Sequence, residues 1–362
     1  MARMSEASRL IGGVSNLEAK LDSRENNFNL VRLVLALLVC FDHAGLVWSG
    51  QTHTELLRIG SVTAGFLAVN GFFVLSGMLI MRSLERGGAG LSYYLSRFLR
   101  LYPGLLALAL VSVFIIGPLV SRQDYWVGIG VLEYAAQILR FGDTMGAPIG
   151  FYPNNPYPLE FNSPLWTLRY ELICYLVAPI ILLLGVFERR YFVAVMTCLA
   201  GVLAWVYVPH ENPVLGSDFL AACLRFAFCF GIGMNIWLWR RWVSTRPMWV
   251  LLSGALFGLS LVVGVGVDVA ATLFVASAVL YAGLMPVGGM RYFEHVDLSY
   301  GVYIWHFPIL QILMGELQWA NPFFLLAVAV MLVLPVAWLS WEFVERPSLK
   351  FKKMILKARL VE

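Results

Sequence analysis

Charge is what this sequence has least of. Asp, Glu, Lys and Arg make up only 13% of its 362 residues, while 60% of the residues are hydrophobic. Soluble domains carry nearer 25% charged residues, and the mean hydropathy here is +0.76. The shortage of charge excludes an ordinary soluble domain. It predicts an all-α, polytopic membrane protein embedded in a lipid bilayer, because its apolar runs have the length of membrane-spanning helices.

Cysteine spacing typical of metal sites, basic patches and internal repeats are also missing. Five cysteines lie inside apolar runs, so we expect small core residues and no metal ligands: Cys40, Cys174, Cys198, Cys223 and Cys229. The net charge of +4 comes from basic residues that punctuate apolar runs, which argues against a nucleic-acid partner. The first apolar run has full span length and follows a polar start, so we expect it to stay as an anchor rather than be cleaved.

What is present is a series of about ten apolar runs of span length. They cover residues 29–48, 61–81, 103–120, 165–187, 191–208, 217–239, 248–265, 267–284, 298–317 and 322–343. We divide the chain into an N-terminal segment (1–27), a membrane domain (28–348) and a basic tail (349–362). Most arginines fall in loops on one side of this map, so the positive-inside rule predicts cytoplasmic termini at both ends. The stretch 121–164 is then external, with an amphipathic piece (125–141) at the interface.

The first span carries ionisable residues that an apolar helix would not need. Arg32 stands near its start, and Asp42 and His43 stand near its end. Arg32 and His43 are eleven residues apart, about three turns, so they share one helix face and lie ~16 Å apart along the axis. A snorkelling arginine and a histidine bonded to a neighbouring helix would explain them structurally. Charge inside a bilayer is costly, and we therefore favour a functional role, above all for His43.

Two arginines precede the third span. Arg97 and Arg100, spaced i and i+3, lie side by side on a helix surface. Anchoring of the span on its positive side is the simpler explanation for such a pair. The alternative is a phosphate clamp, because guanidinium groups bind phosphate oxygens in a bidentate fashion.

Polar residues in two later spans can likewise be explained by a structural or by a functional role. Glu171, one turn into the fourth span, is either paired with Arg169 or Arg225 or functional. His306 precedes Pro308 in the middle of the ninth span. Proline breaks the backbone hydrogen-bond ladder, and His306 is one candidate partner for the carbonyls that are freed. Asn70 and Ser76, in the second span, are typical of residues that join helices.

In their order along the chain, these elements resemble the acyltransferase-3 family of membrane O-acyltransferases, which includes bacterial exopolysaccharide and O-antigen acetylases. The resemblance covers about residues 28–348. It consists of Arg32 and His43 with ten residues between them, FFVLSG (72–77), the Arg97/Arg100 pair, LWTLRYE (165–171), LSYGVYIWHFP (298–308) and a terminal Glu-Arg-Pro. One departure is Arg169, which stands where the family has small or apolar residues before the glutamate.

The resemblance implies an enzyme of the bacterial inner membrane. The donor would be cytoplasmic acyl-CoA, most often acetyl-CoA. The acceptor would be a hydroxyl of a surface polysaccharide, a lipopolysaccharide O-antigen or its lipid-linked precursor. We expect Arg97 and Arg100 to bind the CoA phosphates, and His43, with Arg32 and Glu171, to form the catalytic group. Substrate-binding residues are expected at Trp166, Ser76, His306 and Tyr303.

The role of His43 follows from the chemistry. A sugar hydroxyl needs a base to take its proton, and imidazole has an unperturbed pKa of about 6.5. Asp42 points about 100° away on the helix, so we expect Glu171, from another helix, to orient the ring. His43 could also accept the acyl group itself. Two other functions stay open: a transporter or flippase, and an acyltransferase acting on another glycan or a small molecule such as a periplasmic glucan, lipid-oligosaccharide or antibiotic.

Overall fold

A computed structural model describes residues 26–51, 56–120, 130–140, 160–207, 218–285 and 295–351, together with Leu17, Tyr125, Tyr152, residues 154–158 and Phe293. The expected N-terminal segment (1–27) and the basic tail (349–362) therefore lie largely outside the described residues, and so does about half of the external stretch (121–164). Within the stretch, α7 (Gly130–Leu139) is a helix inside the predicted amphipathic piece.

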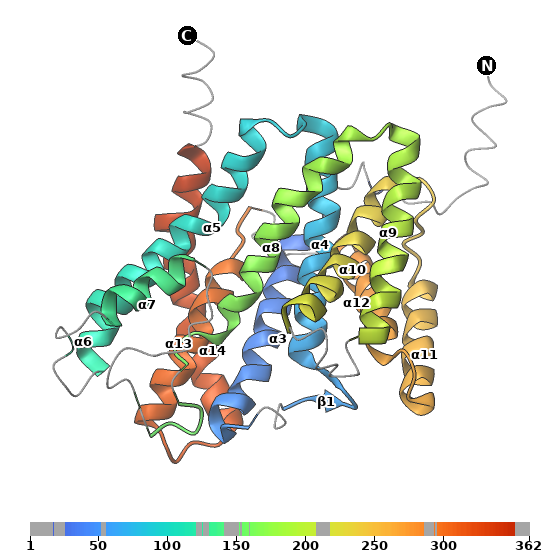
Figure 1. The fold of residues 1–362 in the computed structure, drawn as a ribbon. Coiled ribbons are helices and arrows are strands. Elements are labelled where there is room, and N and C mark those ends of the chain that lie inside the picture. The colour runs from blue at the N-terminus through green and yellow to red at the C-terminus, as the bar shows by residue number, and fades with distance from the viewer. Residues whose placement is uncertain are drawn as a thin grey trace, which may run out of the picture.

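The described chain is almost entirely helical (Figure 1). Its elements are α3 (Phe28–Ser49), the antiparallel hairpin β1 (Arg58–Ile59) and β2 (Val62–Thr63), α4 (Ala64–Gly87), α5 (Leu91–Val111), the π-helical turn η1 (Ser112–Ile116), α6 (Gly117–Val120), α7, the 3₁₀ turn η2 (Ser163–Leu165), α8 (Trp166–Val177), the 3₁₀ turn η3 (Ala178–Leu183), α9 (Val186–Tyr207), α10 (Asp218–Leu238), α11 (Pro247–Val263), α12 (Val267–Leu284), α13 (Ser299–Glu316), α14 (Pro322–Ser340) and the π-helical turn η5 (Trp341–Glu345).

Eight helical segments of the described chain are long and apolar enough to cross a membrane. They correspond to eight of the ten expected spans, and the prediction of an all-α, multi-pass membrane protein is confirmed. The other two expected spans are also helices but differ in character. α11 is one residue short of the 18-residue minimum, and α13 is rich in aromatic and polar side chains, which lower its hydropathy.

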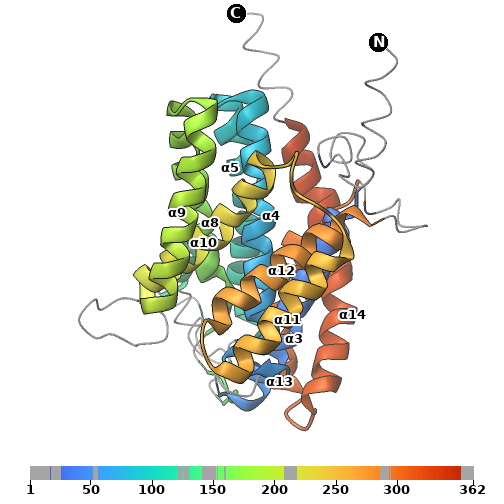
Figure 2. The same ribbon diagram turned by 90° about the vertical axis from the view of Figure 1, so that its right-hand side faces the viewer.

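The helices surround a centre made by α3, α4 and α13. α4 packs against α3 on one side and α10 on the other, and α13 packs against α3 and α14. Figure 1 shows α9 and α11 at the right-hand edge and α5 with α7 at the left, and Figure 2 shows α11 and α12 packed side by side. α13, which is buried along most of its length, is thus enclosed by the other helices, and these meet the hydrocarbon of the bilayer.

Close contact between α4 and α10 depends on glycine. A Cβ atom placed on Gly77 would lie 2.0 Å from the Phe230 carbonyl oxygen, and one on Gly233 would lie 1.9 Å from the Val74 carbonyl oxygen. Each helix therefore needs a missing side chain where the backbone of the other approaches. Small residues at helix crossings are the usual way to bring membrane helices this close.

Pro308 lies inside α13 without ending the helix. Because proline has no N–H, the carbonyl four residues earlier, that of Ile304, loses its helical donor. The Asn162 side chain, just before η2, donates to this carbonyl at 2.9 Å. His306 was a candidate for this role, and that expectation was wrong: its Nδ1 contacts the carbonyl of Val302 instead.

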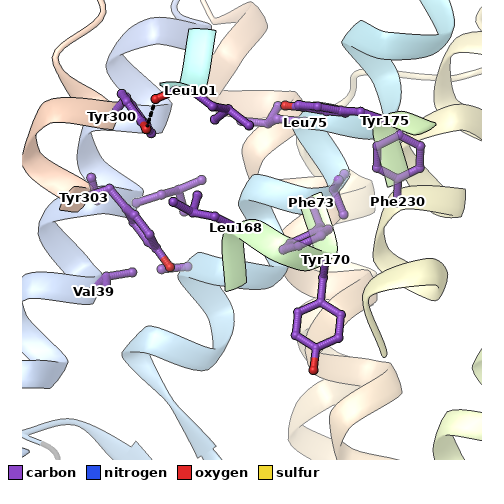
Figure 3. Close-up of a cluster of buried hydrophobic side chains, with 14 of the residues drawn as sticks. Val39, Phe73, Leu75, Leu101, Leu168, Tyr170, Tyr175, Phe230, Tyr300 and Tyr303 are labelled. Carbon is purple, nitrogen blue, oxygen red and sulfur yellow. Dashed lines mark hydrogen bonds between the residues drawn. The ribbon is translucent and has the colours of Figure 1, made fainter. Parts of the chain in front are cut away.

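The core between α3, α4, α8 and α13 is aromatic and aliphatic. Figure 3 shows Tyr300 and Tyr303 projecting from α13 towards Leu168 of α8, and the Tyr300 hydroxyl donates to the Leu101 carbonyl of α5 at 2.6 Å. The cysteines are free; Cys40 and Cys229 are buried as expected, whereas Cys198 is exposed on α9. The tyrosines of α13 thus fix α5 and α8 around the region where the polar side chains meet.

Candidate functional site

An ion-pair group joins the starts of α3 and α13 to the middle of α5. Asp297, two residues before α13, accepts from Arg32 at 3.0 Å and from Arg100 at 2.6 Å. Its other oxygen accepts from the Ser299 backbone N–H at 3.1 Å and from the Ser299 hydroxyl at 2.5 Å. Burial disfavours the charged carboxylate, but the two arginines outweigh this and hold the pKa of Asp297 well below its usual range. Asp297 is therefore a permanent anion between two cations.

Arg97 lies next to this group but is not neutralised by it. Its guanidinium lies 5.6 Å from the ring centres of both Tyr93 and Tyr175. Within the described chain, it makes no ion pair with a carboxylate. We call Arg32, Arg97, Arg100 and Asp297 the arginine cluster: three cations against one anion.

A cavity of about 230 Å³ opens beside the arginine cluster and is lined by all three arginines, Ser76 and Tyr175 among others. Ligand pockets commonly enclose about 300–1,000 Å³, so this one has room for only part of a large ligand. Planar guanidinium groups around a cavity suit phosphate or carboxylate oxygens. The structure thus brings Arg32 together with Arg97 and Arg100, which the sequence had placed in two separate groups.

Glu171 lies next to this cavity, on α8. It accepts a hydrogen bond from Ser76 of α4 at 3.2 Å and one from the Tyr175 hydroxyl, one turn further along α8. A second cavity, of about 40 Å³, is lined by Glu171, Thr167 and Tyr303 and shares Arg32 and Ser76 with the first. It has room for only a few water molecules. The two cavities form a polar route that begins at the arginine cluster and narrows towards the centre of the protein.

His43 and His306 meet deeper in the bundle, where α3 crosses α13. His43 Nδ1 lies 2.9 Å from His306 Nε2, and the two rings are nearly parallel. His306 Nδ1 lies 3.0 Å from the Val302 carbonyl oxygen. His306 is fully buried, whereas His43 is partly exposed. We call these two residues the histidine pair.

The hydrogen-bond chain determines which nitrogens carry protons when both rings are neutral. A carbonyl oxygen can only accept, so His306 Nδ1 carries a hydrogen and His306 Nε2 has a lone pair. His43 Nδ1 must then be the donor in the bond between the two rings. The remaining nitrogen, His43 Nε2, has a free lone pair and can act as a base.

Two expectations for the surroundings of His43 can be compared with the structure. Asp42 points away from the imidazole, as expected: it accepts from the Thr63 hydroxyl at 2.9 Å. Glu171 was expected to orient the ring, and that expectation was wrong. No hydrogen bond joins Glu171 to His43 in the described chain, and His306 occupies the orienting position.

The remaining predicted residues fall into two groups. Tyr303 lines the narrow cavity; its hydroxyl lies 2.5 Å from the Thr167 hydroxyl and 3.0 Å from the Pro164 carbonyl, and its ring contacts His306. Trp166 packs against the rings of Tyr170 and Phe226 and lines neither of the two polar cavities. The structure therefore places Ser76 and Tyr303 at the two cavities, His306 beside Tyr303 and His43, and Trp166 in the aromatic core.

Asp297 and Asn162 are the residues that the sequence interpretation missed. Asp297 had one available signal: it is an acidic residue beside an apolar span, on the side where arginines accumulate. Asn162 had none, because its role depends on a contact across 142 residues. No cluster of three or more His, Cys, Asp or Glu side chains suited to a metal ion occurs among the described residues.

Comparison with known proteins identifies the family of the chain. A family model described as an acyltransferase domain matches residues 25–342. "Nodulation protein 10" of Rhizobium leguminosarum bv. viciae is 27% identical over 372 residues, covering 92% of this chain and 96% of its own. The "O-acetyl transferase" of Shigella phage Sf6 is 27% identical over 330 residues, covering 89% of this chain and 96% of its own. No solved structure matches. The chain is a multi-pass membrane acyltransferase and belongs to the acyltransferase-3 family.

Proposed function

We propose that this enzyme transfers an acetyl group from cytoplasmic acetyl-CoA to a hydroxyl of a cell-surface polysaccharide, a lipopolysaccharide O-antigen or its lipid-linked precursor. The observation that carries the proposal is the chain from the Val302 carbonyl through His306 to His43, which leaves His43 Nε2 free to accept a proton. A base held in one tautomer and orientation by a second group is the arrangement used to activate hydroxyl nucleophiles.

In the proposed reaction, His43 carries the proton of the acceptor hydroxyl to the departing CoA sulfur. The acceptor oxygen attacks the thioester carbonyl carbon while His43 Nε2 takes the hydroxyl proton. The new C–O bond forms, the C–S bond breaks, and the CoA sulfur leaves with the proton returned from His43. The lone pair of His306 Nε2 accepts from His43 Nδ1 throughout and stabilises the transient imidazolium. Direct transfer needs no covalent acyl-histidine, although His43 Nε2 is equally placed to form one.

The arginine cluster supports the donor side of the proposal. Arg97 makes no ion pair with a carboxylate among the described residues, and it lines the cavity of about 230 Å³ with Arg32 and Arg100. The CoA phosphates would bind there, and the thioester arm would extend through the shared residues Arg32 and Ser76. The ring of Phe72 contacts that of Tyr303 along this route, with centres 5.9 Å apart. Because the cavity of about 40 Å³ is so small, the rings of Phe72 and Tyr303 must move apart to admit the thioester arm of CoA.

The acceptor is proposed to enter from the opposite end of the bundle. The name of the phage relative refers to O-acetyl transfer, which supports acetyl as the group and oxygen as its acceptor. Tyr157 and Glu160 lie at this end, against α13. The Gln311 side chain of α13 donates to the carbonyls of Tyr157 and Glu160 at 2.8 and 2.7 Å. The Tyr157 ring also contacts that of Phe307, which in turn contacts the ring of His43, so this part of the chain lies close to the histidine pair.

Orientation in the bacterial inner membrane is part of the same proposal. α3 and α13 run in the same direction, because the Arg32–Asp297 and His43–His306 contacts follow one another along both helices. α14 returns antiparallel to α13, so η5 ends near the level where α3 begins (Figure 1). This agrees with two cytoplasmic termini. Reporter fusions at Gly150 and at the C-terminus should read external and cytoplasmic, respectively; a cytoplasmic signal at Gly150 would refute the orientation.

The test of function is mass spectrometry of surface glycans from cells with the gene, without it, and with a His43→Ala variant expressed at the same level. We expect one acetyl mass to be lost in the second and third samples. In parallel, purified enzyme should release CoA from acetyl-CoA in the presence of the isolated glycan. Unchanged glycans with continued acetyl-CoA consumption would point to the second candidate, a different glycan or small-molecule acceptor.

A further inference from the structure

A second arginine site lies on the other side of α4 from the histidine pair. Arg225 is seven residues into α10, ~10 Å along its axis. Its Nε donates to the Asn70 side-chain oxygen at 2.8 Å, and one terminal nitrogen donates to the Phe66 carbonyl at 3.2 Å. The guanidinium carbon lies 3.9 Å from the centre of the Phe66 ring. In the described part of the chain, no carboxylate lies within ion-pair distance of Arg225.

The partners of Arg225 are neutral, and their orientation is fixed. Asn70 is fully buried, and its amide nitrogen donates to the Thr272 hydroxyl of α12 at 2.8 Å. The amide oxygen of Asn70 must therefore face Arg225. These contacts use two of the five N–H donors of the guanidinium, and neither brings a negative charge. A charged arginine within a membrane protein is normally paired or placed in a water-filled cavity, and here the cavity is present.

The cavity has about 780 Å³ and lies between α9, α10 and the start of α12. Arg225 and Thr272 line its interior, and Ser61 and Asp268 lie at the end nearest the β1–β2 hairpin, where the Ser61 hydroxyl donates to Asp268 at 3.2 Å. Trp205, Val206 and Val265 form an exposed apolar wall. The cavity thus combines one partly buried cation with a side open to the apolar surroundings of the helices.

This cavity lies at about the depth of the histidine pair. The Phe66 backbone N–H donates to the Thr63 hydroxyl, which donates to Asp42, the neighbour of His43. α3 and α10 both pack against α4. A long molecule bound at Arg225 would therefore have to pass the start of α4 to reach His43, without a large change of depth.

We propose that Arg225 binds the phosphate of a long-chain carrier lipid to which the glycan acceptor is attached. The phosphate oxygens would use the free donors of Arg225, and the lipid chain would leave along the apolar wall at Trp205, Val206 and Val265. Asp268, at the hairpin end of the cavity, attracts Arg225 only at long range. The N–H donors of Arg225 that remain free therefore suit an anion at contact distance, and the exposed apolar wall suits one attached to a hydrocarbon chain. The identification of the glycan as the attached group rests on the proposed function; the lipid-phosphate site does not.

The experiment measures binding of polyprenyl monophosphate to the purified full-length chain in phosphatidylcholine nanodiscs by native mass spectrometry. Arg225→Gln removes the cation. Asn70→Asp keeps it but places a carboxylate against it, so the arginine is neutralised from within. We expect both variants to bind the lipid phosphate at least ~10-fold more weakly, the loss typical of one charge-assisted contact. Arg58→Gln, an exposed arginine in the hairpin at the same end, should bind normally.

Two competition experiments identify the ligand. Polyprenol, which lacks the phosphate, should compete poorly, and phosphatidylglycerol, an anionic lipid with two short chains, should compete less well than polyprenyl monophosphate. Normal binding by both variants would overturn the site, and equal competition by phosphatidylglycerol would overturn the carrier-lipid assignment. Asn70→Asp decides the matter if Arg225→Gln does not fold. Acetyl-CoA binding, measured on the same samples, tests the proposed function separately.

Discussion

The arginine cluster and the histidine pair both join α3 to α13, yet they use opposite electrostatics. In the arginine cluster, Arg32 of α3 meets Asp297 at the start of α13, and every member is a permanent charge. In the histidine pair, eleven residues further along α3, His43 meets His306 through two rings that can both be neutral. Fixed charge is placed near the helix ends, where it can recognise a charged donor. Deeper along the same two helices, the contact between α3 and α13 is made by groups that can release their charge, because an ion there is costly.

The largest expected effect comes from breaking the histidine pair. His43→Ala removes the base, and a positioned base contributes about 10²–10⁴-fold to rate. We expect turnover to fall by that factor while acetyl-CoA binding is retained, since the arginine cluster is untouched. His295→Ala, which changes an exposed histidine, is the control. Near-normal glycan acetylation by His43→Ala at wild-type expression would eliminate the base role and make His306 the next candidate.

Removing the negative charge of Asp297 from the arginine cluster should lower the stability of the protein. Asp297→Asn leaves two partly buried arginines without their carboxylate, which costs about 3 kcal/mol or more. Because the pKa of Asp297 is lowered in the folded state, its contribution is complete above the unfolded pKa of about 3.9 and is lost as pH falls through the lower folded value. In detergent, the Tm of Asp297→Asn should be lower than that of the wild-type protein at pH 7, and the two Tm values should converge in strong acid. A constant Tm difference down to the lowest accessible pH would contradict this linkage.

Replacing Arg97 and replacing Arg100 should have different effects on acetyl-CoA binding and on stability. Arg97→Ala removes the guanidinium without an ion pair, so acetyl-CoA should bind about 10–100-fold more weakly with stability little changed. Arg97→Lys should recover only part of the affinity, because a point charge lacks the bidentate geometry. Arg100→Ala should also destabilise the protein, since it removes a partner of Asp297. Binding by calorimetry would test this, with Arg240→Gln as the control, an arginine paired with Glu85 outside the cavity.

The smallest effect is expected at His306, which positions His43 and does not touch the reacting atoms. His306→Leu removes the lone pair that holds His43 Nδ1, and we expect kcat to fall about 10-fold, the value of one hydrogen bond, with KM for acetyl-CoA unchanged. His306→Gln offers an oxygen that can accept the same bond and should restore part of the rate. Equal loss in both variants, or a loss that appears in KM, would show that His306 serves only the packing of α13.

Much of the fold was predictable because it depends on local properties of the chain. The runs expected at 29–48 and 267–284 correspond to α3, Phe28–Ser49, and α12, Val267–Leu284. Apolar length alone specifies such helices. The third span differs, since α5 begins at Leu91 and includes Arg97, Arg100 and Pro103 in one continuous helix. Here the basic residues look like a boundary in the sequence, but the ion pair between Arg100 and Asp297 holds this part of α5 inside the bundle.

The sequence by itself determined the multi-pass helical architecture, the shared face of Arg32 and His43 and the presence of costly polar groups in the spans, because these follow from composition and helical periodicity. Only the tertiary structure decided the partners. His43 meets His306 across 263 positions and not Glu171, and Arg32 and Arg100 converge on Asp297 across 265 and 197 positions. Such contacts depend on which helices cross and at what rotation about their axes. That is set by the summed packing of many side chains, among them the missing ones at Gly77 and Gly233, and not by the polar residues themselves.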